Sequence, residues 1–244
     1  MPGLRRKRKK KWVTAVTVIL IVALLATGGV LFYRHQCEER KLAAFQKEYE
    51  AFYASKLEAF AAENALYEDY EVDVAFIGDS LTDGYDVKSA YPFYTVVNRG
   101  IAGDTTIRLE ERLQVSLYDL KPKVVVMLIG ANNFHTMLSN YERILKGFQE
   151  NLPDTKIILV SLTCMGGEWG KNNQIAAYNN VRIEKLAIKY NYTFVDLYAP
   201  LMNPETGEIY DEYTTDGGHL TPLGYEVFTQ TVTPAIDRFL RWRG

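Results

Sequence analysis

The sequence predicts an α/β fold in which a parallel sheet is covered by helices on both faces. Two observations predict it: after residue 70 short apolar runs alternate with helix-like stretches, and polar residues follow the ends of apolar runs. The apolar runs are residues 72–77, 94–97, 123–129, 156–161 and 192–197. The helix-like stretches are residues 105–118, 138–150, 173–190 and 222–240, the last of which carries Pro222 in its first turn, where proline is tolerated.

The chain carries its charge unevenly. Its formal net charge is −2, but residues 5–11 hold seven basic residues and no acid, which leaves 21 Lys and Arg against 30 Asp and Glu, a balance of −9. An acidic body disfavours a nucleic-acid surface, because such a surface needs basic groups to meet the phosphates. Nucleic acid is therefore not an expected partner.

The segment that follows the basic run predicts a membrane anchor. Residues 12–33 carry no charge, and as a helix rising about 1.5 Å per residue they would cross a bilayer core of about 30 Å. Trp12 and Tyr33 stand at the two ends, where amphipathic rings favour the interface. With residues 1–11 as a basic cytoplasmic tail, the positive-inside rule predicts a single-pass protein of the cell membrane whose remaining residues are extracellular.

A cleaved signal peptide is the alternative interpretation of residues 12–33. Its apolar core would usually be about 7–15 residues long and would end in a small-residue cleavage site. The uncharged stretch here is longer, and LLATGG is a poor version of such a site. The sequence therefore favours a retained anchor.

Residues 34–70 are predicted to form an amphipathic helical stalk. They are rich in Glu, Lys and Ala and contain no Pro or Gly. Apolar residues recur at spacings of mostly three and four, as on one face of a helix: Leu42, Phe45, Tyr49, Phe52, Tyr53, Leu57 and Phe60. Pairing with a second copy is the alternative, but the aromatic seam departs from a clean heptad, so the oligomeric state stays open.

The stretch VAFIGDSLTDGYD, residues 74–86, presents a serine where a buried strand is predicted to end. The hydroxyl of Ser80 is a weak nucleophile until a nearby base takes its proton, so the chain must offer a histidine. His219 has Asp216 three residues before it, and this carboxylate could hold one ring nitrogen and leave the other to face Ser80. A plain turn capped by His219 is the alternative, and the pairing with a strand-end serine favours the catalytic interpretation.

Acyl transfer also needs donors aimed at the oxygen on which negative charge develops. Asn132, just past the third apolar run, offers a side-chain amide, and Ser80 offers its own N–H. Gly103, in NRGIAGDTT, offers a backbone N–H that no side chain shields. Taken singly, each residue is better explained by an ordinary structural role, Gly103 as a turn residue and Asn132 as a loop cap.

Several common site motifs are missing from the sequence. No G-x-S-x-G elbow surrounds Ser80, and there is no Walker loop or dinucleotide fingerprint. The carboxylates Asp79, Asp83, Asp86 and Asp104 lack the spacing of a calcium loop, and no His/Cys cluster indicates zinc. We interpret these carboxylates as loop hydrogen-bond partners and expect neither a metal nor a cofactor.

Four sequence blocks stand in order, each at a loop beyond a predicted strand: FIGDSLTDG, NRGIAGDTT, LIGANNF and DGGHLTPLGY. Together they resemble the SGNH (GDSL-type) hydrolase superfamily of esterases and lipases, and the resemblance covers residues 72 to about 240. It implies a hydrolase domain at residues 71–244. It also implies a flavodoxin-like three-layer α/β/α fold with a five-stranded parallel sheet, and chemistry without metal or cofactor.

The resemblance also implies a role for each site residue. The implied roles are a catalytic triad of Ser80 as nucleophile, His219 as base and Asp216 as orienting acid, and an oxyanion hole of Ser80, Gly103 and Asn132. The third block often ends Asn-Asp in the family, whereas here Asn133 follows Asn132, which keeps the donor and removes a negative charge. A serine ester hydrolase that works through an acyl-enzyme is the expected function.

The residues expected to contact substrate are Asp79, His135 and Trp169. Trp169, in the loop at residues 163–173, could line a sugar or acyl pocket or fold over the core edge, and a structural role is favoured for His135. Aromatic residues at 84–94 fit a carbohydrate platform, an acyl groove or plain packing. We expect short acyl esters of cell-surface or extracellular carbohydrate or lipid, because no long apolar lid segment is present.

Two alternatives to an ester hydrolase belong to other functional classes. The first is an acyltransferase that uses the same site, which the missing acyl-donor transport domain disfavours. The second is a catalytically silent carbohydrate-binding domain, which the joint retention of Ser80, Asn132, Asp216 and His219 disfavours. The hydrolase is therefore the favoured prediction.

Overall fold

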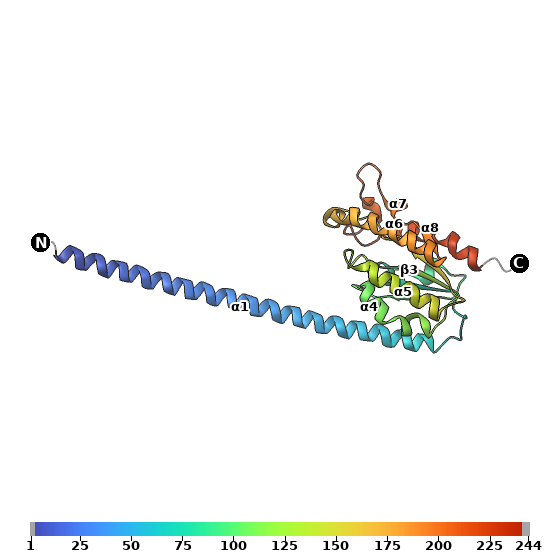
Figure 1. Ribbon diagram of the computed structural model, residues 1–244, viewed down its shortest axis with the longest axis horizontal. Coiled ribbons are helices and arrows are strands. Elements are labelled where there is room, and N and C mark those ends of the chain that lie inside the picture. Colours follow the sequence, from blue (N-terminus) through green and yellow to red (C-terminus); the bar gives the residue numbers. More distant parts are fainter. Residues whose placement is uncertain (1–2, 241–244) are drawn as a thin grey trace. The chain divides into compact units, whose positions relative to one another are not determined.

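The computed structural model describes the backbone of residues 3–240, and in the N-terminal helix it describes the side chains of Leu24 and of residues from 27 onward (Figure 1). That helix, α1, runs from Gly3 to Asn64. The side chains of the predicted basic tail and of most of the predicted anchor at residues 12–33 lie outside this description. Within the described residues, no helix is both long and apolar enough to cross a membrane.

The chain forms two compact units, residues 1–54 and 55–244. In the first unit, Leu42 and Phe45 of the predicted apolar face are 57% and 66% exposed. The second unit contains the last turns of α1 and all the strands of the sheet.

The sheet has five strands, all parallel, in the order β2-β1-β3-β4-β5. The strands are Val74–Gly78 (β1), Val96–Gly100 (β2), Val124–Leu128 (β3), Lys156–Val160 (β4) and Thr193–Val195 (β5). This is the flavodoxin-like order, so the predicted fold class is confirmed for the α/β part of the chain. The register pairs Gly78 with both Gly100 and Leu128, so the loops that follow β1, β2 and β3 leave the sheet at one level.

Helices follow the strands much as the sequence predicts. They are α2 (Ser80–Asp83), α3 (Val87–Ala90), α4 (Thr106–Glu111), α5 (Met137–Asn151), α6 (Asn173–Tyr190), α7 (Tyr198–Leu201) and α8 (Pro222–Leu240). The single helix expected at residues 105–118 is instead α4 followed by a wide π-helical turn at Gln114–Tyr118. The break lies at Arg112, whose buried side chain reaches the carbonyl oxygen of Gly78 at the end of β1.

Side chains of the strands alternate between two apolar cores, one on each face of the sheet. Ala75 and Ile77 of β1 belong to the core that includes residues of α5 and α6, whereas Val74 and Phe76 belong to the core that includes residues of α8. Every residue of β1 and β3 is buried. Burial on both faces explains why these strands read as continuous apolar runs in the sequence.

The last turns of α1 pack inside the second unit. Lys56, Phe60, Glu63 and Asn64 share one face of the helix, because they are spaced by three and four residues. Phe60 is 5% exposed, and the guanidinium of Arg99 lies over its ring at 4.9 Å from the centroid. Glu63 and Asn64 both accept hydrogen bonds from the Arg99 guanidinium. The end of the predicted stalk is therefore a packed part of the α/β unit.

Candidate active site

The strand-to-helix turn after β1 positions Ser80. β1 ends at Gly78, Asp79 caps the N-terminus of α2, and Ser80 is the first residue of that helix. A side chain at Gly78 would place its Cβ 2.0 Å from the carbonyl oxygen of Leu128 in β3, so only glycine allows the two strands to approach at this level. The turn therefore presents the serine hydroxyl at the carboxyl edge of the sheet.

His219 and Asp216 complete a hydrogen-bonded chain with Ser80. Nε2 of His219 lies 3.1 Å from Oγ of Ser80, and Nδ1 of His219 lies 2.8 Å from Oδ2 of Asp216. With Nδ1 protonated toward the carboxylate, Nε2 is left to accept the serine proton. The structure thus brings together the three residues that the sequence predicted as a triad.

Asp216 is held as an anion by its own loop. Its pKa is lowered to about 2, first by the backbone N–H of His219 and then by the imidazole and by the N–H of Gly218. Oδ1 accepts both backbone N–H groups, at 2.8 Å from His219 and 2.9 Å from Gly218, while Oδ2 meets the imidazole. The carboxylate is therefore fixed in direction and able to stabilise a positive charge on the ring.

Two loops converge where the oxyanion donors were predicted. Nδ2 of Asn132 donates to the carbonyl oxygen of Asp104 at 2.8 Å, which uses one of its two protons and leaves the other. Gly103, next to Asp104, is exposed and has a φ of 79°, a left-handed conformation suited to glycine. Asn133 bonds Thr106 twice, accepting from its N–H at 3.2 Å and donating to its Oγ1 at 2.9 Å. Asn133 therefore ties the loop after β3 to the start of α4 without adding a negative charge near the site.

A small cavity of about 50 Å³ opens beside the nucleophile. It is lined by Asp79, Ser80, Leu81, Ala131, Asn132, Thr163, Met165, Trp169, Gly218 and His219. Trp169 therefore lines the pocket instead of folding over the core edge, and it remains 47% exposed. His135 is exposed and is not among the lining residues.

Asp79 lies in this lining but is almost inaccessible. It is 1% exposed, and its Oδ1 accepts the N–H of Leu81 at 3.2 Å as the cap of α2. Burial raises the pKa of this carboxyl to about 7. Asp79 thus bonds the backbone of the nucleophile's helix, as its interpretation as a loop hydrogen-bond partner predicts, and its burial does not favour the substrate contact that the sequence also suggested.

Comparison with known proteins identifies the family. Residues 76–227 match the GDSL-like Lipase/Acylhydrolase family. The chain belongs to this family. Platelet-activating factor acetylhydrolase IB subunit alpha2 of Homo sapiens is 30% identical to the hydrolase over 185 residues, covering 70% of the hydrolase and 79% of the relative. The Rattus norvegicus protein of the same name gives the same identity and coverage.

Solved structures agree with this assignment. A GDSL-like lipase from Bacteroides thetaiotaomicron is 26% identical, with a TM-score of 0.67 over 75% of the hydrolase and 98% of that chain. A catalytic variant of an acetylxylan esterase from Geobacillus stearothermophilus shares the fold, with 22% identity and a TM-score of 0.57 over 69% of the hydrolase and 95% of that chain. The resemblance seen in the four sequence blocks is confirmed, and the chain is a carboxylic ester hydrolase.

Behind the site, the buried side chain of Arg112 holds two of the active-site loops together through hydrogen bonds that the sequence did not reveal. Nε of Arg112 bonds Oδ2 of Asp104 at 2.8 Å, and its other nitrogens donate to Gly78 O at 3.1 Å and to Ser116 Oγ at 2.9 Å. Because Asp104 follows Gly103 and Gly78 precedes the nucleophile's turn, one arginine joins both loops.

Thr163 and Met165, which line the small cavity, were not predicted from the sequence. Their place after β4, at the same edge of the sheet, was a signal that could have identified them.

A second support starts from α1. Lys56 forms an ion pair with Oδ1 of Asp83, the last residue of α2, and Oδ2 of Asp83 accepts the N–H of Ala102 at 3.2 Å. Ala102 immediately precedes Gly103. Asp83 therefore connects the helix of the nucleophile to the loop of the second oxyanion donor. Among the described residues, no group of three or more His, Cys, Asp or Glu side chains could hold a metal ion.

Proposed function

We propose that this hydrolase cleaves esters of short acyl groups by nucleophilic attack from Ser80. The observation that carries the proposal is the unbroken chain from Ser80 Oγ to His219, at 3.1 Å, and from His219 to Asp216, at 2.8 Å. As Oγ attacks the ester carbonyl, Nε2 of His219 takes the hydroxyl proton. The ionised Asp216 holds the ring in position and stabilises the imidazolium that forms.

The negative charge of the tetrahedral intermediate develops on the former carbonyl oxygen. The backbone N–H groups of Ser80 and Gly103 and the free proton of Asn132 Nδ2 are the donors that stabilise it. The intermediate collapses when the alcohol oxygen takes the proton from His219, which leaves an acyl group on Ser80. A water then loses its proton to His219 and attacks the acyl-enzyme, which releases the acid and restores the serine hydroxyl.

The acyl group is proposed to be short. The cavity beside Ser80 offers only about 50 Å³, between Leu81, Met165 and Trp169, which is room for a methyl or ethyl group and not for a long chain. The relative with 30% identity is named as an acetylhydrolase, which agrees with a short acyl group. For the alcohol we propose a cell-surface or extracellular carbohydrate or lipid.

The cellular placement of this activity is part of the proposal. Residues 5–11 are all basic and residues 12–33 are uncharged, which supports a single-pass anchor with a cytoplasmic N-terminus and an extracellular hydrolase domain. Amino-terminal sequencing of the mature protein from the membrane fraction tests this placement. A mature chain that starts near residue 30 would replace the anchor with a cleaved signal peptide.

Turnover of p-nitrophenyl acetate and p-nitrophenyl octanoate by the full chain in detergent, beside Ser80→Ala, tests the mechanism. We expect acetate to be preferred and turnover to fall by at least about 10⁴-fold in the variant. Ser139→Ala, which changes a serine outside the cavity lining, is the matched control and should keep its activity. Equal turnover in wild type and Ser80→Ala would refute the assigned nucleophile.

Water and alcohols compete for the same acyl-enzyme. Because His219 and Asp216 are about half exposed, an acceptor alcohol can also reach the site. Product analysis with an added alcohol separates the two outcomes: free acid indicates the hydrolase, and a new ester as the main product indicates an acyltransferase. A folded wild type that does not react with a fluorophosphonate serine probe would indicate a silent binding domain.

A further inference from the structure

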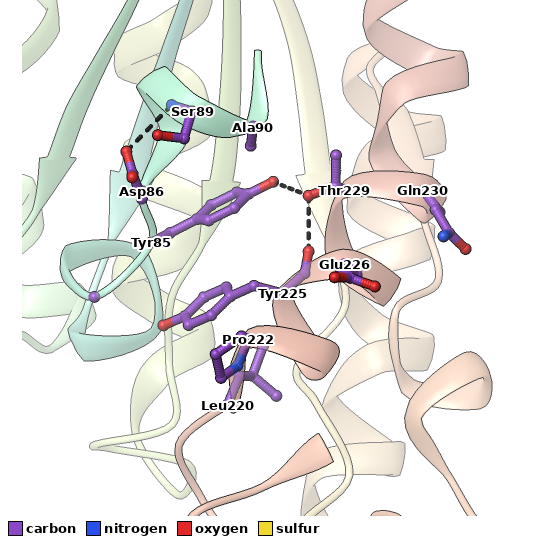
Figure 2. Close-up of a pocket in the computed structure, with 11 residues that line it drawn as sticks. Tyr85, Asp86, Ser89, Ala90, Leu220, Pro222, Tyr225, Glu226, Thr229 and Gln230 are labelled. Carbon is purple, nitrogen blue, oxygen red and sulfur yellow. Dashed lines mark hydrogen bonds between the residues drawn. The ribbon is translucent and has the colours of Figure 1, made fainter. Parts of the chain in front are cut away.

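A second and larger cavity lies between the segment 84–90 and the first half of α8 (Figure 2). Its volume is about 730 Å³, within the range of about 300–1,000 Å³ that is usual for small-molecule sites. It is lined by Gly84, Tyr85, Asp86, Ser89, Ala90, Leu220, Pro222, Tyr225, Glu226, Thr229 and Gln230. None of these residues belongs to the triad, the oxyanion donors or the lining of the small cavity.

This cavity is built on the same two chain segments that carry Ser80 and His219. Gly84 lies one helical turn beyond Ser80, and its N–H donates to the Ser80 carbonyl at 3.0 Å. Leu220 directly follows His219. Tyr225 of α8 donates from its hydroxyl to the carbonyl oxygen of Leu81 at 3.0 Å. The two cavities have no lining residue in common, but both are built on residues 80–84 and 218–222.

The positions of the proton donor and of the oxyanion donors indicate which cavity takes the acyl group of an ester and which takes its alcohol group. The leaving alcohol must receive its proton from Nε2 of His219, so it departs on the side of that ring, whereas the oxyanion faces Asn132. The residues that follow His219 line the large cavity, and the small cavity has room only for a short acyl group. The alcohol arm is therefore the arm that can extend toward the large cavity.

Resting on the proposed function, we propose that the large cavity holds the alcohol portion of the substrate and selects an uncharged, hydroxyl-rich alcohol of about the size of one or two sugar rings. Asp86 and Glu226 are the charged residues of the lining, which contains no Lys, Arg or His. The pKa of Asp86 is lowered by hydrogen bonds from Ser89, so it is an anion at neutral pH. An alcohol that carries phosphate or carboxylate would meet two like charges and no counter-charge.

Polar groups suited to hydroxyls stand around an apolar floor. In the part of the chain that the structure describes, the side chains of Glu226 and Gln230 make no hydrogen bond to protein, which leaves a carboxylate and an amide to bind substrate hydroxyls. Ala90, Leu220 and Pro222 supply an apolar surface for the C–H groups of a sugar ring. This combination of a few placed polar groups on an apolar surface is typical of sites for small neutral ligands.

A cationic alcohol is the competing occupant, and the aromatic residues disfavour it. Tyr85 is 4% exposed and is stacked with Tyr225 and with Phe228, each at 5.0 Å between ring centroids, so it offers no free ring face for a cation. Figure 2 shows the two tyrosine rings lying one over the other, with Thr229 bonded to the Tyr85 hydroxyl and to the Tyr225 carbonyl. Asp86 and Glu226 are exposed, so water and salt weaken their attraction for a cation as much as their repulsion of an anion, and it is the covered tyrosine ring that disfavours a cation.

The test compares kcat/KM for four acetyl esters that share an acyl group: ethyl acetate, mono-O-acetylated cellobiose, mono-O-acetylated glucose 1-phosphate and acetylcholine. We expect the cellobiose ester to be hydrolysed best and the phosphate ester to be at least about tenfold poorer. Gln230→Trp, which puts an indole at the cavity rim, should lower kcat/KM for the cellobiose ester about tenfold and leave ethyl acetate within about twofold.

Reversing the charge of Glu226 gives a second test, in which activity toward one substrate is expected to rise instead of fall. Glu226→Lys should raise kcat/KM for the phosphate ester about tenfold, whereas Glu184→Lys on α6, an exposed residue outside the cavity, should not. A cellobiose ester that is no better than ethyl acetate, or a Gln230→Trp variant that affects both equally, would overturn the proposal. Preference for acetylcholine would replace the sugar with a cationic alcohol.

Failure of the esterase assignment is distinguishable from failure of this subsite. If p-nitrophenyl acetate is not hydrolysed in a Ser80-dependent way, the proposed function fails whatever the cavity binds. Titration calorimetry of free cellobiose against the Ser80→Ala chain then tests the cavity without turnover. Binding that Gln230→Trp abolishes supports the subsite, and absence of binding in Ser80→Ala itself overturns it.

Discussion

The open face of the active site and the region behind it are built in different ways. On the open face, the side chains of His219 and Asp216 are 50% and 47% exposed and contact each other and Ser80. Behind the loops, the side chains of Arg112 and Asp104 are 1% and 0% exposed and form a 2.8 Å salt bridge. We infer that the exposed residues carry out the reaction and the buried ones hold the loops in place. Substitutions on the open face should therefore lower kcat, whereas substitutions behind it should lower the free energy of unfolding.

The two environments explain this separation. Exposed polar groups exchange protein partners for water at small cost, so a triad bond contributes little to folding. A buried charge that loses its partner keeps its full desolvation penalty. Substitutions in the two environments should therefore differ in whether they lower the stability of the fold or the rate of the reaction.

Removing the buried arginine should have the largest effect on stability. Arg112→Met leaves the Asp104 carboxylate buried without its ion-pair partner, and we expect the free energy of unfolding to fall by about 3–5 kcal/mol in urea denaturation. The matched control is Arg143→Met, which breaks an exposed pair with Glu110 and should cost less than about 1 kcal/mol. Equal losses in the two variants would show that the buried pair is not the support of the site.

Asp79 gives a prediction with a defined pH dependence. Folding raises the pKa of Asp79 to about 7, so the folded chain binds this proton more tightly than the unfolded chain. The stability that this group contributes is therefore greatest at low pH and is lost as the pH rises from about 4 to about 7. Asp79→Asn keeps a side-chain oxygen that can accept the Leu81 N–H but removes the titration.

The measurement for Asp79 is the free energy of unfolding of wild type and Asp79→Asn at pH 4 and pH 8. The variant should gain on the wild type between these values by up to about 4 kcal/mol, because a shift of one pKa unit corresponds to about 1.4 kcal/mol. Asp104, whose pKa burial also raises, is present in both chains, so its own burial cancels in the difference, whereas its repulsion of Asp79 is part of the effect that is measured. A difference in stability that is the same at both pH values would contradict the raised pKa.

On the open face, Asn132→Ala should lower kcat by about 10²–10³-fold while KM changes little, because an oxyanion donor acts mainly in the transition state. The free energy of unfolding should fall by about 1 kcal/mol, since one hydrogen bond to the Asp104 carbonyl is lost. Asn151→Ala, which removes a similar side-chain bond to a backbone carbonyl on α5, is the control for stability alone. A variant that loses stability as Asn151→Ala does but keeps its kcat would exclude Asn132 as a donor.

The open face was largely predictable from the sequence, and the support was not. Ser80, Asn132 and His219 follow strand ends or precede a helix in a parallel sheet, so topology alone brings them to one edge. Arg112 lies in a stretch that reads as a helix, where a charged residue usually marks a solvated face. Its partners at Gly78 and Asp104 are distant in the sequence, and nothing local shows that they meet.

The positions of Trp169 and Asp79 could not be predicted because they depend on the conformation of loops. Trp169 was compatible with a pocket or with the core edge, because the path of the glycine-rich segment 163–173 is not set by periodicity. Asp79 carries a carboxylate that sequence alone suggests is available to substrate. Its burial follows from the turn that places it under α2, a helix of four residues that is too short to show a period.

Substitution of Lys56 should give the smallest of the four predicted effects. Lys56 helps to hold the active-site loops, as Arg112 does, but it is partly exposed, so it tests whether such a residue affects kcat or only stability. Its ion pair with Asp83 reaches the N–H of Ala102, next to Gly103, so its loss should loosen an oxyanion donor. We expect Lys56→Met to lower kcat about fivefold at nearly constant KM, since a partly exposed charged hydrogen bond contributes about 1 kcal/mol. Steady-state kinetics with p-nitrophenyl acetate measure both parameters.

Two comparison variants decide whether Lys56 acts by position. Lys56→Arg keeps the charge and should recover most of kcat, and Lys47→Met removes the same charge from an exposed site on the same helix and should change nothing. A kcat loss in Lys56→Met that arginine restores would mean that the end of α1 positions the oxyanion loop. A loss of stability without a loss of kcat would instead show that Lys56, like Arg112, stabilises the fold and has no effect on the position of the oxyanion loop.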